Sequence, residues 1–458
     1  MSSFWDRPGG HNQYIAAVLA SLSVFNFGVT IGWSAPSVFA VTEKKYYGFA
    51  VSLTEYGWAC AMANLGCALT MVPAAALANC IGRKLIMLLV VLPYIAGWVL
   101  TIYPFNMYLL MFSRLLQGLC AGCYLIIASV YCVEISQVEV KSYIGNFPLI
   151  FYYLGILYAY ILGAFNNMRY LNYGCAVTPA VFLLTFVWMP ESPVYYMLKN
   201  KKMKAIGSLQ WLRGKHMDAA REYDDIMGAI ERLRDNNKFS CQKLRRLASA
   251  KAIIICTIMV AFKNLCGSIA IIMYSTLMLD AADSQIFMDS KVSIIFIGIS
   301  VLISTLISVH KFDSRRTLMI WSIIMVALNC ALQSIYFQMK DSYVHSLQWL
   351  PIVSFCCFSF FFGLGVGIYP FVMMRQLFGE NIEILAASVV WTLNELFAFC
   401  GAVSFPYILH VWNMAVCFWI FTALAFLCLI FIYFLVPETK KIADSKEMLD
   451  EKQNTVTK

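Results

Sequence analysis

Charged residues are scarce in this sequence. Only 13% of its 458 residues are Asp, Glu, Lys or Arg, whereas 61% are hydrophobic. Soluble globular domains carry about 25% charged residues, so a single water-exposed globular domain is excluded. The apolar excess is too large for one buried core, and it points to a chain that resides in lipid.

Catalytic and metal-binding motifs are also missing. The five histidines are scattered without metal-ligand spacing, and no glycine-rich loop leads into Lys followed by Ser or Thr, as ATP-driven transport requires. Cys120 and Cys123 form a CxxC, but no second pair completes a metal site. Most of the 16 cysteines lie in apolar segments, where cysteine packs as a small hydrophobe. We therefore predict no enzyme activity, no cofactor and no metal.

Long apolar runs dominate what is present. A helix needs about 20 mostly apolar residues to cross a bilayer. Since lipid offers the backbone no hydrogen-bond partners, only helices or a closed barrel can span it. We predict an all-α membrane protein whose 12 transmembrane helices lie at residues 14–32, 56–77, 85–103, 107–130, 145–164, 173–189, 252–279, 292–309, 318–337, 350–374, 385–409 and 414–435.

These runs form two sets of six with a polar stretch between them. We predict a first six-helix half at 1–193, a helical linker at 194–250, a second half at 251–436 and a flexible tail at 437–458. Short basic turns in matching places, "ANCIGRKL" after the second run and "KFDSRRTL" after the eighth, support an internal duplication. Two related halves around a central cavity are typical of alternating-access transporters.

Lysine and arginine gather between residues 199 and 251, a stretch that holds 14 of the 34 basic residues. Basic residues accumulate on the cytoplasmic side of membrane proteins, so we predict a cytoplasmic linker and two cytoplasmic termini. The net charge of +9 then reflects topology and not a nucleic-acid-binding surface. The predicted partners are the lipid bilayer, in the plasma membrane, and a small solute.

Local patterns refine this outline. In the linker, Ala205, Leu209 and Leu212 recur at helical spacing, which predicts short amphipathic helices. Glycine and proline interrupt two apolar runs, in "FGVTIGWSAP" of the first and "GLGVGIYP" of the tenth. Such positions are either hinges beside a cavity or sites of close helix packing, and the sequence leaves both open.

One charge stands out within the apolar runs. The seventh run contains Lys263, in "AFKNLCGSIA". A charge near the membrane centre costs about 2.5–3.5 kcal/mol or more unless it is paired or hydrated. An intramembrane lysine therefore indicates a functional site or a buried partner.

Six motifs occur in order along the chain. They are "FGVTIGWSAP" (27–36), "NCIGRK" (79–84), "SRLLQGLCAGCYLIIASVYCVEIS" (113–136), "PESPVYYML" (190–198), "SLQWLRG" (208–214) and "VPETK" (436–440). Together they resemble the sugar porter family of the major facilitator superfamily, and within it the insect facilitated trehalose transporter-like group. The resemblance covers nearly the whole chain. It implies the major facilitator fold and facilitated diffusion of a sugar, a hexose or trehalose.

The resemblance also implies a cytoplasmic gate, in which ion pairs form when the cavity faces outward and break when it opens inward. The matching residues are Arg83, Lys84, Glu134, Lys141, Glu191, Arg315, Arg316 and Glu438. The second half departs from the family pattern, because Gln376 and Glu383 stand where the family has a Glu and an Arg. Val194 likewise replaces the Arg that follows "PESP". We therefore expect a weaker latch than in relatives.

The implied solute site departs further. Where the family has amides and an aromatic plate, this chain has Leu149, Lys263, Asn264, Ile269, Val301, Phe371 and the pair Asn394–Glu395. We predict Lys263, Asn264, Phe371, Asn394 and Glu395 as solute-binding residues. Our hypothesis is that Lys263 and Glu395 form an ion pair across the site, or hold a charged or zwitterionic solute between them. The alternative is that both simply face cavity water.

Proton coupling is not expected from the first helix. Proton-driven relatives carry an Asp there, near the Arg of helix 4, and this chain has Thr30 with Arg114. Uniport is the simpler expectation, and Glu395 is the residue that could overturn it. Two other functions stay open: a carrier of another small solute, favoured by the lost amides, and a sensor without transport. Nothing indicates the rings of charges or carbonyls that line a channel.

Overall fold

The computed structural model of the chain describes residues 10–43, 46–214, 218–237, 247–284, 287–309, 315–343, 347–370 and 383–436. Every long regular element in these ranges is a helix, which confirms the predicted all-α fold class. The first half consists of α1 (His11–Gly32), α2 (Ser34–Thr42), α3 (Leu53–Ile81), α4 (Arg83–Leu89), α5 (Val91–Ile102), α6 (Met107–Ile135), α7 (Lys141–Ile144), α8 (Phe147–Ala164) and α9 (Met168–Phe186).

Three helices follow in the linker, as its amphipathic spacing predicts. They are α10 (Pro193–Leu198), α11 (Lys202–Arg213) and α12 (Ala219–Asn237). The second half consists of α14 (Leu247–Lys263), the π-helical turn η1 (Asn264–Ser268), α15 (Ile269–Ala281), α16 (Ser290–Ser308), α17 (Arg315–Tyr343), α18 (Leu350–Leu364), α20 (Glu383–Val411) and α21 (Met414–Leu435).

Among the described residues, ten helices are long and apolar enough to span a membrane, and α18 is a shorter apolar helix. The predicted span at 173–189 corresponds to α9, which is not among the ten. Its first turns contain Arg169 and Asn172, and these lower its hydropathy. The predicted span at 414–435 agrees with α21, whose apolar run begins directly after the N-cap Asn413.

Polar caps decide where several helices begin. Ser52 and Glu55 form a capping box at the start of α3, with Ser52 Oγ accepting from the Glu55 amide at 3.2 Å. The side chains of Asn106 and Asn413 cap α6 and α21 in the same position. Each cap satisfies an amide that the helix itself leaves without a partner.

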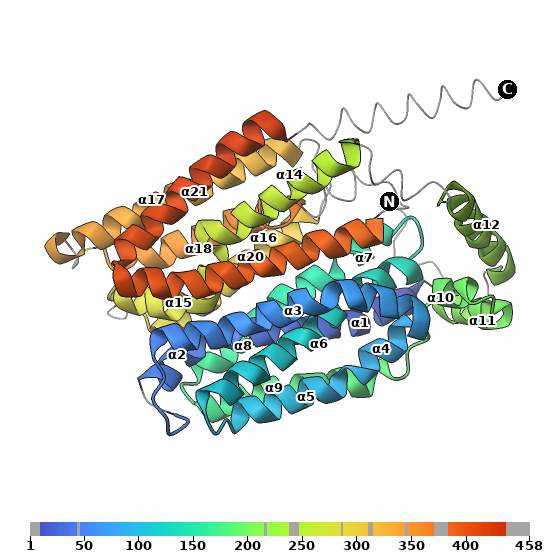
Figure 1. Cartoon of the computed structure of the whole chain (residues 1–458), viewed down its shortest axis with the longest axis horizontal. Coiled ribbons are helices and arrows are strands. Elements are labelled where there is room, and N and C mark those ends of the chain that lie inside the picture. Colours follow the sequence, from blue (N-terminus) through green and yellow to red (C-terminus); the bar gives the residue numbers. More distant parts are fainter. Residues whose placement is uncertain are drawn as a thin grey trace.

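The long helices run side by side along the molecule, with α10, α11 and α12 gathered at one end and α2 and α15 toward the other (Figure 1). We call these the linker end and the far end. Consecutive membrane spans alternate in direction along the chain. As a result, α3 begins at the far end and α20 ends there.

Among the described residues, the hydrogen bonds between the two halves lie between the cavity and the far end. Tyr160 Oη donates to the Ile272 carbonyl at 2.6 Å, and Lys291 Nζ donates to Asn166 Oδ1 at 2.6 Å. Trp58 Nε1 also donates to Tyr407 Oη at 3.3 Å. The bundle is therefore closed at its far end in this conformation.

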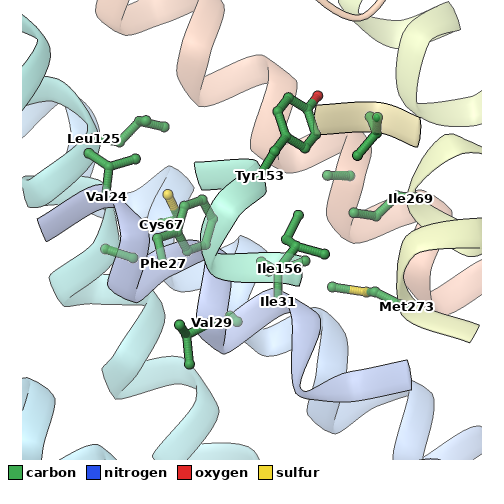
Figure 2. Close-up of a cluster of buried hydrophobic side chains, with 14 of the residues drawn as sticks. Val24, Phe27, Val29, Ile31, Cys67, Leu125, Tyr153, Ile156, Ile269 and Met273 are labelled. Atoms are coloured by element: carbon green, nitrogen blue, oxygen red, sulfur yellow. The ribbon is translucent and has the colours of Figure 1, made fainter. Parts of the chain in front are cut away.

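Apolar side chains fill much of the boundary between the halves. Figure 2 shows Tyr153 and Ile156 of α8 close to Ile269 and Met273 of α15, within one continuous buried cluster. Packing of this kind is non-directional. It can re-form after the halves shift, unlike a network of buried hydrogen bonds.

One glycine at the far end lies where there is no space for a side chain. A Cβ atom on Gly57 of α3 would lie 2.7 Å from Cγ of Pro406 in α20. A real Cβ does not approach another carbon that closely, so the two helices meet here because position 57 has no side chain.

We expect Gly57→Leu to shift the protein toward a state that is open at the far end. Overpacking costs about 1–3 kcal/mol, and a difference of that size shifts an equilibrium roughly 5- to 150-fold. Double electron–electron resonance between spin labels at the far ends of α3 and α20 measures the change as a longer distance. Gly207→Leu is the control, since nothing lies within 4 Å of a Cβ there. Equal distance distributions for the two variants contradict the assignment.

Candidate functional site

The seventh predicted span is broken in its middle. The single apolar run at 252–279 folds as α14, the π turn η1 and α15. Gly267 has φ of 98°, a left-handed conformation that glycine adopts readily and other residues rarely. A Cβ there would also lie 2.7 Å from Cδ2 of Phe421. The sequence analysis did not predict this break.

The break leaves backbone groups without their usual helical partners, and a side chain satisfies one of them. Ser268 Oγ donates to the carbonyl of Lys263 at 2.6 Å. π turns often occur at functional sites because they re-aim the side chains around them. Here the turn follows Lys263 directly and begins with Asn264.

Four of the predicted solute-binding residues meet at this turn. Lys263 Nζ donates to Asn394 Oδ1 at 3.2 Å, and Asn394 Nδ2 donates to Glu395 Oε1 at 2.9 Å. Asn264 Nδ2 donates to Asn394 Oδ1 and to the Asn394 carbonyl, each at 3.0 Å. The amide of Asn394 thus connects the lysine of α14 to the glutamate of α20. Glu395 is buried, with 5% of its surface exposed.

This arrangement offsets the cost of placing a lysine within an apolar span. An amide oxygen accepts and an amide nitrogen donates, so Asn394 presents its negative end to Lys263 and its positive end to Glu395. Hydrogen bonds to charged groups contribute about 1.5–3 kcal/mol each. The predicted pairing of Lys263 and Glu395 therefore takes the form of a bridge through Asn394.

A cavity adjoins the bridge. Its volume is about 50 Å³, room for a few waters at roughly 10–15 Å³ per water position. A larger solute requires the halves to move apart. The lining residues from the first half are Phe27, Asn64, Leu125, Leu149, Tyr152 and Tyr153, and those from the second are Lys263, Asn264, Ser268, Ile269, Ile272, Phe362, Trp391, Asn394, Glu395 and Ala398.

Other positions implied by the resemblance fall as follows. Leu149 and Ile269 line the same cavity, and Val301 lines a smaller, mostly apolar pocket beside it. Phe371 and Gln376 lie outside the described residues, as does the side chain of Glu383.

The sequence analysis missed several lining residues. Asn64 is 1% exposed, and its Nδ2 has no hydrogen-bond partner in the described part of the chain. Trp391 lies three residues before Asn394, on the same face of α20. Tyr152, Tyr153 and Phe27 add aromatic surface. The i, i+3 spacing of Trp391 and Asn394 was the available signal, whereas Asn64 stands alone in an apolar run.

At the linker end, the predicted gate residues of the first half meet one another. Arg83 Nη2 lies 2.7 Å from Glu134 Oε1, and Ser192 Oγ donates to Glu134 Oε2. Arg83 is buried at 2% exposure. These contacts hold α4, α6 and the segment before α10 together.

Glu191 acts on the backbone of its predicted partners. Its carboxylate accepts from the Arg83 amide at 3.0 Å and from the Lys84 amide at 3.0 and 3.1 Å. It thereby caps the first turn of α4, where a negative charge also complements the helix dipole.

Two other gate residues, Lys141 and Arg316, do not join this cluster. Lys141 is exposed on α7. Arg316 Nη2 donates to the Tyr433 carbonyl of α21 at 2.5 Å, a contact within the second half. The side chain of Arg315 and all of Glu438 lie outside the described residues.

Arg114 lies deep in the first half. Its Nη2 donates to the Thr30 carbonyl at 2.6 Å, and its Nη1 donates to Gln117 Oε1 at 2.9 Å. The guanidinium also lies 4.8 Å from the centre of the Trp33 ring. Within the described residues, no carboxylate forms an ion pair with it.

Two helical halves around a central cavity, with polar groups at a broken helix, define a membrane transporter of the alternating-access class. The model of the Sugar (and other) transporter family matches residues 15–445, and the chain belongs to that family. The resemblance to sugar porters is thereby confirmed.

Curated relatives include insect facilitated trehalose transporters. Tret1 of Drosophila virilis is 27% identical over 93% of this chain, and the chain spans only 47% of that protein's length. The Tret1-2 homolog of Drosophila simulans is 27% identical over 94% of the chain and 88% of the relative. Tret1 of Apis mellifera ligustica is 28% identical, over 93% and 86% respectively.

Solved structures share the fold. The xylose transporter XylE from E. coli, in a partially occluded inward open conformation, superposes with a TM-score of 0.78 at 17% identity. The match covers 94% of this chain and 99% of that one. The proton:xylose symporter XylE bound to 6-bromo-6-deoxy-D-glucose matches with a TM-score of 0.76 at 16% identity.

We expect Asn394→Leu to destabilise the protein. Leucine has a similar shape but leaves Lys263, Asn264 and Glu395 without their shared amide, and one unsatisfied buried polar group costs about 1–3 kcal/mol. A lower melting temperature in detergent measures this. Thr392→Val on the same helix is the control, since within the described part of the chain Thr392 Oγ1 donates only to the Ser388 carbonyl of its own helix. Equal melting temperatures for the two variants refute the bridging role.

Proposed function

We propose that the protein carries a sugar, a hexose or trehalose, across the plasma membrane by facilitated diffusion. The observation that carries this is the cavity between the halves, where amides and charged groups lie opposite aromatic surface. Sugars need donors and acceptors for their hydroxyls and flat apolar groups for their ring faces. Membership of the sugar transporter family and the names of the insect relatives support the same conclusion.

The proposed topology places the linker end in the cytoplasm. The linker holds the densest group of basic residues, which favours that side. Residues 1–193 and 251–436 are the two moving halves, 194–250 the cytoplasmic linker and 437–458 a cytoplasmic tail. With the far end closed, the cavity is shut off from the outside in the described conformation.

Alternating access requires the far-end contacts to open and the linker end to close. We assign the linker-end contacts of Arg83, Glu134 and Glu191 to the first half as a unit. They hold α4 against α6 and the start of the linker. Closure then comes from the approach of the second half to this unit.

The surroundings of Arg114 support uniport, and Glu395 in the cavity is the acid that proton coupling would require. The hydrogen-bond partners of Arg114 are a backbone carbonyl, an amide oxygen and a hydroxyl, and none of these groups ionises near neutral pH. A carrier without an exchangeable acid at that site dissipates a sugar gradient and does not build one.

A second candidate function, transport of a charged or zwitterionic solute, is favoured by Lys263 and Glu395. It predicts flux of such solutes in place of glucose. A third reading, a sensor, predicts no flux of any solute.

We expect purified protein in liposomes to take up labelled glucose or trehalose saturably. Unlabelled sugar on the opposite side should accelerate exchange, because the loaded carrier reorients. An imposed pH gradient should leave the final internal concentration unchanged, and protein-free liposomes set the background. Accumulation above the external concentration under a pH gradient contradicts uniport, and the absence of sugar flux contradicts the sugar assignment.

A further inference from the structure

We propose that Lys263, Asn394 and Glu395 act as a charge-balanced filter, which admits polyhydroxyl solutes of zero net charge and rejects sugar acids and amino sugars. This inference rests on the proposed sugar transport and names the class of sugar. It assigns specificity to the three residues, beyond their contribution to the fold.

The bridge has a fixed polarity. The lysine donates to the oxygen of Asn394, and the nitrogen of Asn394 donates to Glu395. Reversal of the amide would place like partial charges against each other at both ends. One end of the site therefore offers donors and the other offers acceptors.

A sugar hydroxyl matches both ends. It can accept from the ammonium group and donate to the carboxylate, so two hydroxyls of one ring can engage the two charges. Glu395 Oε1 accepts from Asn394, and within the described residues no group donates a hydrogen bond to its Oε2. A hydroxyl proton can therefore reach this carboxylate.

The rest of the cavity lining carries no formal charge. Its other members are apolar, aromatic, hydroxyl or amide side chains. The positive and negative charges of the site thus sum to zero. A solute with a net charge brings a charge that this lining does not compensate. An uncompensated charge in a nonpolar region is costly.

The first half adds a neutral donor opposite the bridge. Asn64 lines the cavity from α3, and its buried Nδ2 has no partner in the described part of the chain. An unsatisfied buried donor is destabilising until a ligand or water accepts from it. A neutral hydroxyl meets this requirement without changing the charge balance.

Removal of one charge should switch the preference of the site. Lys263→Gln leaves Glu395 as the only charge of the lining, so protonated glucosamine should gain relative to glucose. Glu395→Gln leaves Lys263, so glucuronate should gain. We expect inhibition by the favoured charged sugar, relative to inhibition by glucose, to increase about tenfold or more in each variant, since charge complementarity governs specificity. The double variant should again prefer glucose.

The experiment is competition against labelled glucose uptake in liposomes, with glucose, glucosamine and glucuronate as competitors on the same pyranose ring. Wild-type protein should be inhibited about tenfold more weakly by either charged sugar. Labelled trehalose replaces glucose if only the disaccharide is carried. A second charge pair provides the matched control: Lys340 Nζ and Asp283 Oδ2, 2.6 Å apart at the far end and outside the cavity. Lys340→Gln and Asp283→Asn remove a positive and a negative charge in the same way. Both variants should keep the wild-type order of inhibition by the three competitors.

Two failures can be told apart. Absence of uptake of both glucose and trehalose by the wild-type protein overturns the proposed function itself. Uptake of glucose that all three competitors inhibit equally overturns the filter and leaves sugar transport standing. This wild-type ranking needs no variant, so the test holds even where a lone buried charge prevents folding. Folded single variants that keep the wild-type order also overturn the filter.

Discussion

A charge within the membrane must be compensated, and this constraint organises the centre of the protein. Lys263 lies where an ordinary transmembrane helix would place an apolar residue. The chain meets the cost with three neighbours, since Asn394 accepts from the lysine and from Asn264, and donates to Glu395. The π turn that follows Lys263 gives Asn264 its place in this network. The helix break, the contact of α14 with α20 and the polar wall of the cavity all follow from the same requirement.

The polar groups of the site are distributed unevenly between the halves. Lys263, Asn264, Asn394 and Glu395 all belong to the second half, whereas the first half contributes mainly apolar and aromatic surface, with Asn64 as its buried amide. A buried network with fixed partners resists deformation, and apolar surfaces re-pack with little loss. The second half can therefore move against the first without breaking the bridge. The hydrogen bonds that must break lie between the cavity and the far end, and join residues such as Tyr160 and Ile272.

Sequence patterns predict the helices well, because membrane spans are selected by hydropathy alone. They do not reveal the break at Gly267, since a glycine that permits a π turn looks the same as one that permits close packing. Lys263 and Glu395 were found because charge is rare in apolar runs, and the family resemblance placed them at one cavity. The resemblance predicts Asn394 as a sugar ligand, and in the described conformation its amide bonds to Lys263, Asn264 and Glu395. Asn64 and Trp391 are ordinary residues in apolar helices, and only the tertiary arrangement shows which face meets the cavity.

The broken helix also connects the cavity to the far end. Lys263 closes α14, and α15 resumes after the π turn and carries Ile272, whose carbonyl accepts from Tyr160 across the boundary. α15 contacts α2 and α20 as well, so it is held by both halves. An intact helix would transmit a displacement rigidly, but Gly267 has a conformation that absorbs a change in direction. A solute that alters the contacts of Lys263 thus acts at the junction between α14 and the far-end segment α15. The residue that is costly to bury is therefore placed where its compensation by a solute can influence which end of the bundle is open.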